Sequence, residues 1–201
     1  VPVRPPIPGL ELPGVMTSDE LLEGSDHLYR SIVIIGGGVI GVEFATFYND
    51  LGCEVTVLEG MNRLLPTLDR ELGQNLGLIL KKRGVKVITG ATVEGVEQAK
   101  DGLTVRFATK KGADAVTGEK VLCAIGRRAY WDGLFADDFT PENDGKRLLV
   151  DARYQTSLPH VYAIGDVSSQ VQLAHMASAQ GTAVAELLCG SGSDVDLNVV
   201  P

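Results

Sequence analysis

Short apolar runs and amphipathic stretches alternate along the first half of the chain. Runs of four or five branched apolar residues fit strands that are buried on both faces, whereas apolar positions three and four apart fit helices. The pattern predicts strands and helices in turn over residues 32–35, 39–51, 54–58, 69–83 and 85–88. This β-α-β-α-β order favours a parallel sheet with right-handed crossovers.

The pattern changes after residue 90, where short strand-like pieces follow one another without helices. Residues 92–98, 103–107 and 119–124 are three such pieces, joined by polar turns. Short connections favour an antiparallel meander over further βαβ units. Residues 148–150 and 161–164 are additional short strand candidates. An alanine-rich stretch at 172–189 predicts a final helix.

Prolines dominate the start of the chain. Five of them lie within residues 1–14. Each removes a backbone donor and keeps the preceding residue out of the helical region, so we expect an extended segment there. Residues 18–22 then predict a short helix, with Thr17 or Ser18 as its N-cap and acidic residues in its first turn.

Composition and charge narrow the function classes. The 201 residues are 44 % hydrophobic and 22 % charged, which is ordinary for a folded protein with a sizeable core. A net charge of −8 argues against nucleic acid or an anionic membrane as the main partner. No apolar run reaches the roughly 18 residues of a membrane span, and the proline-rich start lacks the apolar core of a secretory signal.

The three cysteines are far apart in the sequence. An odd number without short spacings predicts neither a disulfide framework nor a zinc site, and it fits a reducing cytoplasm. We expect Cys53, Cys123 and Cys189 to act as small apolar packing residues.

A glycine-rich turn joins the first predicted strand to the first predicted helix. Its residues match G-x-G-x-x-G and are Gly36, Gly37, Gly38, Val39, Ile40 and Gly41. In a dinucleotide site the first glycine allows a tight turn, the second lets a pyrophosphate approach the backbone, and the third lets the helix pack closely. A P-loop is not indicated, because no Gly-Lys-Ser/Thr follows. The alternative is a tight strand-to-helix turn that binds nothing.

Acidic residues supply the other candidate contacts. Glu59 ends the second strand at about the 20-residue spacing expected of an acid that binds an adenosine ribose. A carboxylate there disfavours a 2′-phosphate, so NAD is favoured over NADP, although nearby Arg63 weakens this preference slightly. Glu43 in the first helix and Asp166 after a predicted strand are further candidates. A solvated helix residue and a turn aspartate explain these two equally well.

Several motifs together resemble the pyridine nucleotide–disulfide oxidoreductase family. They are SIVIIGGGVIGVEFA at 31–45, EVTVLE at 54–59, AIGRR at 124–128, TSLPHVYAIGDV at 156–167 and LAHMA at 173–177. The resemblance is strongest to members that oxidise a dihydrolipoyl group with NAD. It implies a Rossmann-like FAD/NAD(P)-binding α/β fold, in which a parallel sheet carries helices on one face and a three-stranded antiparallel meander on the other.

The resemblance also implies two cofactor sites. It assigns NAD to Gly36, Gly37, Gly38, Val39, Ile40, Gly41, Glu43, Glu59, Val93 and Gly126. It assigns FAD contacts to Asp166, Gln172, Leu173, Ala174 and His175, with His175 acting through its backbone. Neither a catalytic residue nor a metal site is expected here, because the family's redox-active cysteine pair has no counterpart in the chain.

A domain layout follows from the same resemblance. We expect a linker over residues 1–16, an NAD-binding domain over 17–147 and a returning segment of the FAD-binding domain over 148–201. Such a central part of an enzyme is expected to bind NAD without turnover. The whole enzyme would be a cytoplasmic homodimer, joined through a further C-terminal domain, that acts on a lipoyl-bearing protein or a small disulfide.

Three alternatives stay open. A mercuric, coenzyme A-disulfide or NADH-oxidase relative would share both cofactor sites, and Ala129, where the family usually has proline after GRR, leaves the subfamily undecided. A non-catalytic nucleotide-binding or redox-sensing module would keep the NAD site alone. A structural α/β domain without a ligand is least favoured by the spacing of Gly36 and Glu59.

Overall fold

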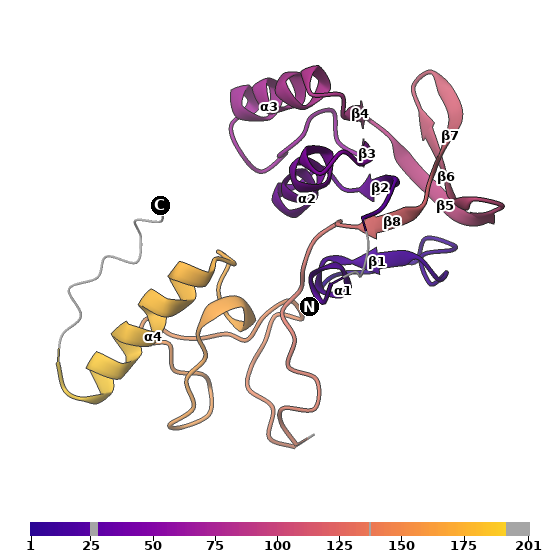
Figure 1. Cartoon of the computed structure of the whole chain (residues 1–201). Helices are drawn as coiled ribbons and strands as arrows, with labels where there is room; N and C mark the ends of the chain where they lie inside the picture. The colour runs from indigo at the N-terminus through magenta and orange to yellow at the C-terminus, as the bar shows by residue number, and fades with distance from the viewer. Residues whose placement is uncertain (25–27, 137, 192–201) are drawn as a thin grey trace. The chain divides into compact units, whose positions relative to one another are not determined.

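The computed structural model of the chain describes residues 1–24, 28–136 and 138–191 (Figure 1). The chain divides into two compact units, Pro2–Arg127 and Arg128–Pro201 with Val1. The first unit contains β1 (Val15–Thr17), α1 (Ser18–Leu22), β2 (Ser31–Ile35), α2 (Val39–Asp50), β3 (Glu54–Glu59), α3 (Arg70–Lys82), β4 (Lys86–Thr89), β5 (Thr92–Ala99), β6 (Gly102–Thr109), β7 (Gly112–Gly118) and β8 (Lys120–Cys123). The second contains the 3₁₀ helix η1 (Gly165–Val167) and α4 (Ala174–Leu188).

Parallel strands form the centre of the first unit. Their order across the five-stranded sheet is β1-β8-β2-β3-β4. The helices α2 and α3 connect β2 to β3 and β3 to β4, which confirms the predicted β-α-β-α-β order. Because the strands are parallel, their carboxyl ends meet at one edge, where α/β folds of this kind bind ligands.

Two apolar cores cover the two faces of this sheet. Residues such as Ile34 and Val57 pack with Val42 of α2 and Leu80 of α3. Val33 and its alternate neighbours pack instead against the strands β5 and β6 of the meander. Each fully buried aliphatic side chain contributes about 1.5–3 kcal/mol. The predicted arrangement, with helices on one face and a meander on the other, is therefore confirmed (Figure 1).

The meander differs from the prediction in its third strand. It consists of β5, β6 and β7 in antiparallel order, so residues 119–124 are not part of it. Those residues supply β8, which pairs in parallel with β1 and β2. Val121, Leu122 and Cys123 are buried on both faces, as a central parallel strand requires. The true third strand, Gly112–Gly118, is rich in small and polar residues, so it lacks the apolar alternation that marks a strand.

The proline-rich start also contributes more than a linker. Val15–Thr17 forms β1, which pairs with β8 at the edge of the sheet. Upstream, the Val3 N–H donates to the Gly126 carbonyl at 2.9 Å, and the Val96 N–H donates to the Pro8 carbonyl at 2.8 Å. The first compact unit thus begins at Pro2 and ends at Arg127, whereas the sequence layout has boundaries after residues 16 and 147. Which cofactor each part serves stays a prediction.

In the second unit the helix is confirmed and the strands are not. Residues 148–150 and 161–164 form only the single bridges Asn143↔Leu148 and Gln155↔Tyr162. Such short pieces need a longer neighbour to build a ladder, and none exists among the described residues of this unit. The unit is ordered instead around α4, because the Gly165 N–H donates to the Gln180 side-chain oxygen at 2.7 Å.

Two ion pairs attach α1 to distant parts of the first unit. The Arg127 guanidinium donates to the Asp19 carboxylate at 2.7 Å, and Arg4 pairs with Glu20 at 2.6 Å. Thr17 and Glu20 also form a capping box, which confirms Thr17 as the N-cap. The hydrogen bond from Arg127 lowers the pKa of Asp19, and the hydrogen bond from the Thr17 backbone lowers the pKa of Glu20.

We predict that the first unit is less stable in acid because of these two carboxylates. Their folded pKa values are depressed, so the stabilisation is present above the unfolded values of about 4 and is lost as the pH falls through the folded values. The Asp19→Asn/Glu20→Gln variant should lose less than about 1 kcal/mol at pH 7 and show a flatter acid limb.

Urea unfolding at pH 7, 5 and 3, followed by far-UV circular dichroism, measures both effects. The control is Glu94→Gln, which removes an exposed carboxylate from β5. A double variant with the same acid limb as the unsubstituted chain would contradict the prediction.

Candidate functional site

The residues predicted to bind NAD converge at the carboxyl edge of the parallel sheet. Residues 36–41 connect β2 to α2, and Glu59 is the last residue of β3. A Cβ added at Gly36 would lie 2.4 Å from the Ala124 carbonyl oxygen, so the segment that leads to Gly126 passes beside the glycine turn. The Glu59 carbonyl accepts a hydrogen bond from the Ala91 N–H at 2.9 Å, two residues before Val93.

Gly36 and Gly41 are required in the turn for different physical reasons, whereas Gly38 is not required by the fold. Gly36 has a φ of +110°, a backbone conformation that residues other than glycine rarely adopt. A Cβ at Gly41 would lie 2.0 Å from the Gly36 carbonyl oxygen, so this glycine lets α2 approach β2. Gly38 has an ordinary φ of −72° and open space where its Cβ would be. Neither its backbone conformation nor its packing requires glycine, and the open side leaves room for a ligand.

Glu59 is buried against the turn, with 7 % of its surface exposed. One carboxylate oxygen accepts from the Gly37 N–H at 2.6 Å, and the other accepts from the Met61 N–H at 2.6 Å. The Gly37 carbonyl in turn accepts from the Leu65 N–H at 2.8 Å. The acid therefore joins the glycine turn to the loop that follows β3. A carboxylate offers about four acceptor positions, so it keeps capacity for ribose hydroxyls.

The loop between β3 and α3 is part of the site, and sequence reasoning missed it. Leu64 is 1 % exposed, and its side chain would lie 2.5 Å from a Cβ at Gly37. Its carbonyl oxygen would lie 2.2 Å from a Cβ at Gly73, so this glycine lets the loop pack on α3. The available signal was the Leu-Leu-Pro sequence at 64–66, followed by a helix that carries glycine at positions 73 and 77.

Arg63 belongs to the same loop. It forms no ion pair with Glu59. Its guanidinium donates to the carbonyl oxygens of Pro66 at 2.9 Å and Leu68 at 3.3 Å. These bonds hold the arginine to its own loop. Arg63 thus forms no ion pair with the Glu59 carboxylate at the end of β3.

The start of α2 is a ready anion-binding element. Its N-cap, Gly38, has no side-chain hydrogen bond, so the first-turn N–H groups lack a capping acceptor. Val39 is 48 % exposed in this turn, Ile40 is partly buried, and Glu43 lies exposed one turn further on. Free N–H groups, the positive end of the helix dipole, the open side of Gly38 and the ribose-type acid together fit a dinucleotide.

The residues assigned to FAD lie in the second unit. Asp166 is exposed in η1. Gln172, Leu173, Ala174 and His175 are exposed at the start of α4, where Leu173 is an N-cap without a side-chain hydrogen bond. A Cβ at Gly165 would lie 3.1 Å from the Cβ of Ala177, so η1 packs closely on this helix. Asp166 and the N-terminus of α4 therefore lie in the same unit. The carboxylate can accept hydrogen bonds and the helix N–H groups can donate them, a combination that fits part of a flavin site.

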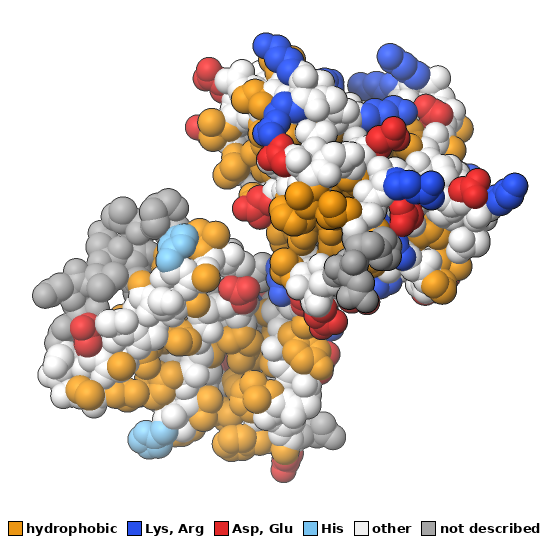
Figure 2. All heavy atoms as spheres, in the orientation of Figure 1, with side chains coloured by type: hydrophobic (Ala, Val, Ile, Leu, Met, Phe, Trp, Pro, Cys, Tyr) orange, Lys and Arg blue, Asp and Glu red, His pale blue; other side chains and the backbone are white. Residues whose placement is uncertain are grey.

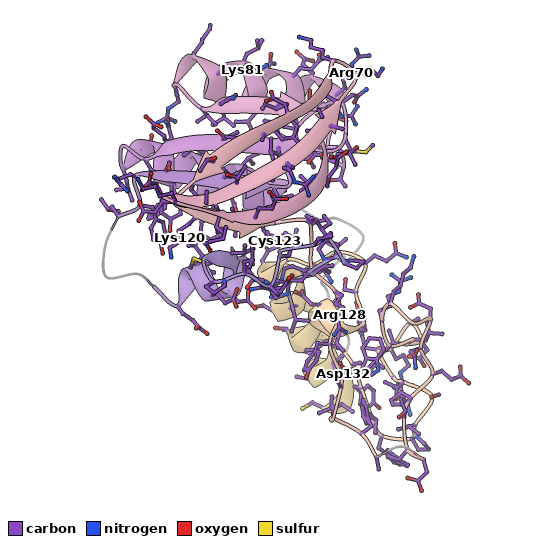
Figure 3. The ribbon with its side chains drawn as sticks, turned by 90° about the vertical axis from the view of Figure 1, so that its right-hand side faces the viewer. Arg70, Lys81, Lys120, Cys123, Arg128 and Asp132 are labelled. Atoms are coloured by element: carbon purple, nitrogen blue, oxygen red, sulfur yellow. The ribbon has the colours of Figure 1, made fainter. Side chains whose placement is uncertain are left out.

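No disulfide joins the three cysteines; Cys53 and Cys123 are buried, and Cys189 is exposed. Burial raises the pKa of Cys53 to about 11, and burial also raises the pKa of Cys123. Cys123 lies at one end of β8 and Lys120 at the other (Figure 3). The predicted packing role is therefore confirmed for these two cysteines. It is wrong for Cys189, which is exposed at the C-cap of α4.

Within residues 1–24, 28–136 and 138–191, no group of His, Cys, Asp and Glu is arranged to hold a metal ion. None of the helices in those ranges has both the length and the apolar character that crossing a bilayer demands.

Comparison with known proteins agrees with this geometry. The family described as "Pyridine nucleotide-disulphide oxidoreductase" matches residues 1–181. A dihydrolipoyl dehydrogenase of Bacillus subtilis (strain 168) is 39 % identical over 97 % of this chain, which spans 42 % of that relative. The chain thus spans less than half the length of this curated relative.

Solved structures give a similar result. The HOCl-induced flavoprotein disulfide reductase RclA from Escherichia coli has a TM-score of 0.85 at 31 % identity, over 95 % of this chain and 43 % of that one. The water-forming NADH oxidase from Lactobacillus brevis, bound to NADH, has a TM-score of 0.78 at 25 % identity, over 90 % of this chain and 42 % of that one.

We predict that alanine at Gly36 and at Gly38 has very different effects on stability. Gly36→Ala combines a strained φ with a backbone clash and should cost about 3 kcal/mol or more. Gly38→Ala meets open space and should cost about 0.5–1 kcal/mol, as expected when glycine is lost from an N-cap. Urea unfolding of the two variants measures the difference. Similar losses of stability in both would show that the turn is not built as described.

Proposed function

Because the chain belongs to the pyridine nucleotide-disulphide oxidoreductase family, we propose that its first unit binds NAD(H). We further propose that the chain is the nucleotide-binding part of an enzyme of the dihydrolipoamide dehydrogenase type. The observation that carries the proposal is the buried Glu59 carboxylate held against the glycine turn.

We assign each part of the NAD molecule to different residues of the first unit. The pyrophosphate is placed at the open side of Gly38, where the first-turn N–H groups of α2 can donate to it. The adenosine ribose is placed at Glu59, whose carboxylate is already oriented by Gly37 and Met61. The adenine is placed beside Val93 on β5.

The nicotinamide end is assigned to the remaining residues of the site, Glu43 and Gly126. Both are exposed in the first unit and have side chains or backbone open to a ligand. A 2′-phosphate on the adenosine would meet the Glu59 carboxylate, and repulsion between the two anions favours NAD over NADP. Arg63 does not offset this preference, because the loop carbonyls hold its guanidinium.

In the second unit, Asp166 and the start of α4 are proposed to bind part of FAD. Asp166 would accept hydrogen bonds from flavin side-chain hydroxyls, and the α4 N-terminus would donate to the ring system through backbone N–H groups. When bound, the two cofactors would supply the electron-transfer chemistry: a dihydrolipoyl dithiol would lose two electrons and two protons, and NAD⁺ would take up both electrons and one of those protons as NADH, so that one proton is released overall. The residues of this chain bind and orient these groups.

The proposal extends to the protein of which such a region is a part. It would be a homodimeric cytoplasmic enzyme acting on a lipoyl-bearing protein or a small disulfide. A disulfide reductase like RclA or an NADH oxidase is the second candidate, since structures with those names share the fold at 31 % and 25 % identity. A non-catalytic NAD-binding module is the third, because no disulfide joins the described cysteines.

We predict that the purified chain binds NADH at least tenfold more tightly than NADPH, because Glu59 repels the 2′-phosphate. Gly38→Ala should retain the fold and lose most of this binding, because its new methyl group occupies the open side of the turn. Isothermal titration calorimetry with both nucleotides measures both effects, and Gly77→Ala, at a helical glycine of α3 that is not assigned to NAD and has no positive φ, is the control. Equal affinity for NADH and NADPH, or unchanged binding by Gly38→Ala, would contradict the assignment.

We also predict that the 201-residue chain does not turn over a disulfide substrate. Two of its cysteines are buried and the third lies on α4, so no dithiol can exchange with the substrate. The measurement is NADH oxidation at 340 nm with lipoamide and added FAD. Lipoamide-dependent turnover that persists after Cys189→Ser would show that electrons follow another route.

A further inference from the structure

A pocket of about 570 Å³ lies in the first unit beside the proposed NAD site and shares Asn62 of the β3–α3 loop with it. Residues 87–90 at the end of β4 form one wall, and residues 109–114 of the β6–β7 hairpin form another. Asn62 and Phe107 complete the lining. None of the residues assigned to NAD lines this pocket. Its volume lies within the range of about 300–1,000 Å³ that is typical of small-molecule sites.

Apolar side chains form part of the lining. Val87 and Ile88 of β4 are half-buried, and Phe107 of β6 is 1 % exposed in the core beneath the meander. Ile88 and Phe107 belong to the core on the meander face of the sheet, whereas Val87 packs with the core on the helix face. The apolar surface of the pocket is therefore Ile88 together with the edge of the Phe107 ring.

Two lysines at the hairpin tip give the pocket a positive rim. Lys110 and Lys111 form the two-residue connection between the paired residues Thr109 and Gly112. The Thr109 hydroxyl closes this turn by accepting from the Lys111 N–H at 3.1 Å. Neither lysine has a positive φ, so the turn itself does not require lysine at either position.

The charges of these lysines are not compensated within the described part of the chain. No ion pair there joins Lys110 or Lys111 to a carboxylate. The pocket carboxylate, Asp114, accepts from the Ala115 N–H of its own strand at 2.8 Å. Figure 2 shows that Lys and Arg side chains gather on this part of the first unit, around α3 and the hairpin. The charges of the two lysines outweigh that of the Asp114 carboxylate in the pocket lining, so the rim attracts anions although the whole chain carries a net charge of −8.

Backbone groups add polar contacts along the same wall. β4 is the last strand in the order β1-β8-β2-β3-β4, so one side of it has no strand neighbour. Such an edge presents N–H and C=O groups that a ligand can use. The side chains of Thr89 and Asn62 provide further hydrogen-bonding groups at the wall.

We propose that this pocket binds a small aromatic anion. The ring lies against Ile88, above the edge of Phe107, and the anionic group lies beside the ammonium groups of Lys110 and Lys111. Two neighbouring ammonium groups match the two charges of a phosphate monoester better than the single charge of a carboxylate. The ligand class is therefore an aromatic phosphate, with aromatic carboxylates as weaker ligands.

Phenyl phosphate is the probe that tests this proposal. It is titrated into the ¹⁵N-labelled 201-residue chain, and amide shifts are followed by NMR at Thr89, Gly90, Lys111 and Gly112. Saturable shifts at these amides are the expected result, with weaker binding of benzoate and still weaker binding of inorganic phosphate and benzyl alcohol. Absence of saturable shifts there would overturn the proposal, and so would equal shifts with inorganic phosphate, because the ring would then contribute nothing.

Matched charge variants separate the pocket from general electrostatics. Lys110→Gln/Lys111→Gln should weaken phenyl phosphate binding about tenfold. The control, Lys81→Gln/Lys82→Gln, removes the same charge from adjacent exposed lysines at the end of α3, outside the pocket (Figure 3). Equal losses in both variants, or an unchanged affinity in the first, would overturn the proposal. The shifts at residues 36–41 are recorded separately, so failure here leaves the NAD assignment unaffected.

Discussion

The bond network of the Glu59 carboxylate is the constraint on which the nucleotide-binding edge depends. Its two oxygens accept from Gly37 and Met61, and this fixes the glycine turn and the β3–α3 loop relative to each other. Loss of the carboxylate would leave two backbone donors without acceptors, at about 1–3 kcal/mol for each that stays buried. The same group is the proposed ribose acceptor. One side chain thus holds the site in shape and selects its ligand, because the bonds that orient it leave part of its acceptor capacity unused.

Close packing around this carboxylate explains why the turn contains several glycines. Gly36 and Gly41 leave no space for a methyl group, so β2, α2 and the segment after β8 approach one another closely. Gly38 alone faces open space. The two cores on either side of the sheet hold the strand ends in place. A rigid support of this kind allows the N-terminus of α2 to act as a preorganised anion site without a charged side chain.

Sequence reasoning succeeded where one local pattern determines the structure. The glycine turn, α2, α3 and Glu59 at the end of β3 have such patterns, and the structure contains all of them. It failed where pairing between distant segments determines which sheet a strand joins. The strand β8 pairs with β2, which is more than 80 residues earlier in the sequence, and no local feature distinguishes β8 from a strand of the meander. The bonds from Met61 and Leu65 were likewise hidden, because backbone donors have no sequence signature. The nucleotide contacts themselves rest on resemblance and geometry together.

Amide hydrogen exchange with and without saturating NADH tests the central claim most directly. That claim is that the glycine turn, Glu59 and the loop after β3 form one preorganised nucleotide site. The account predicts slower exchange at the amides of Gly38, Val39 and Ile40, and at the Met61 amide that Glu59 already accepts from. Protection by NADH confined to the second unit, or the absence of protection at residues 36–41 at saturation, would contradict it.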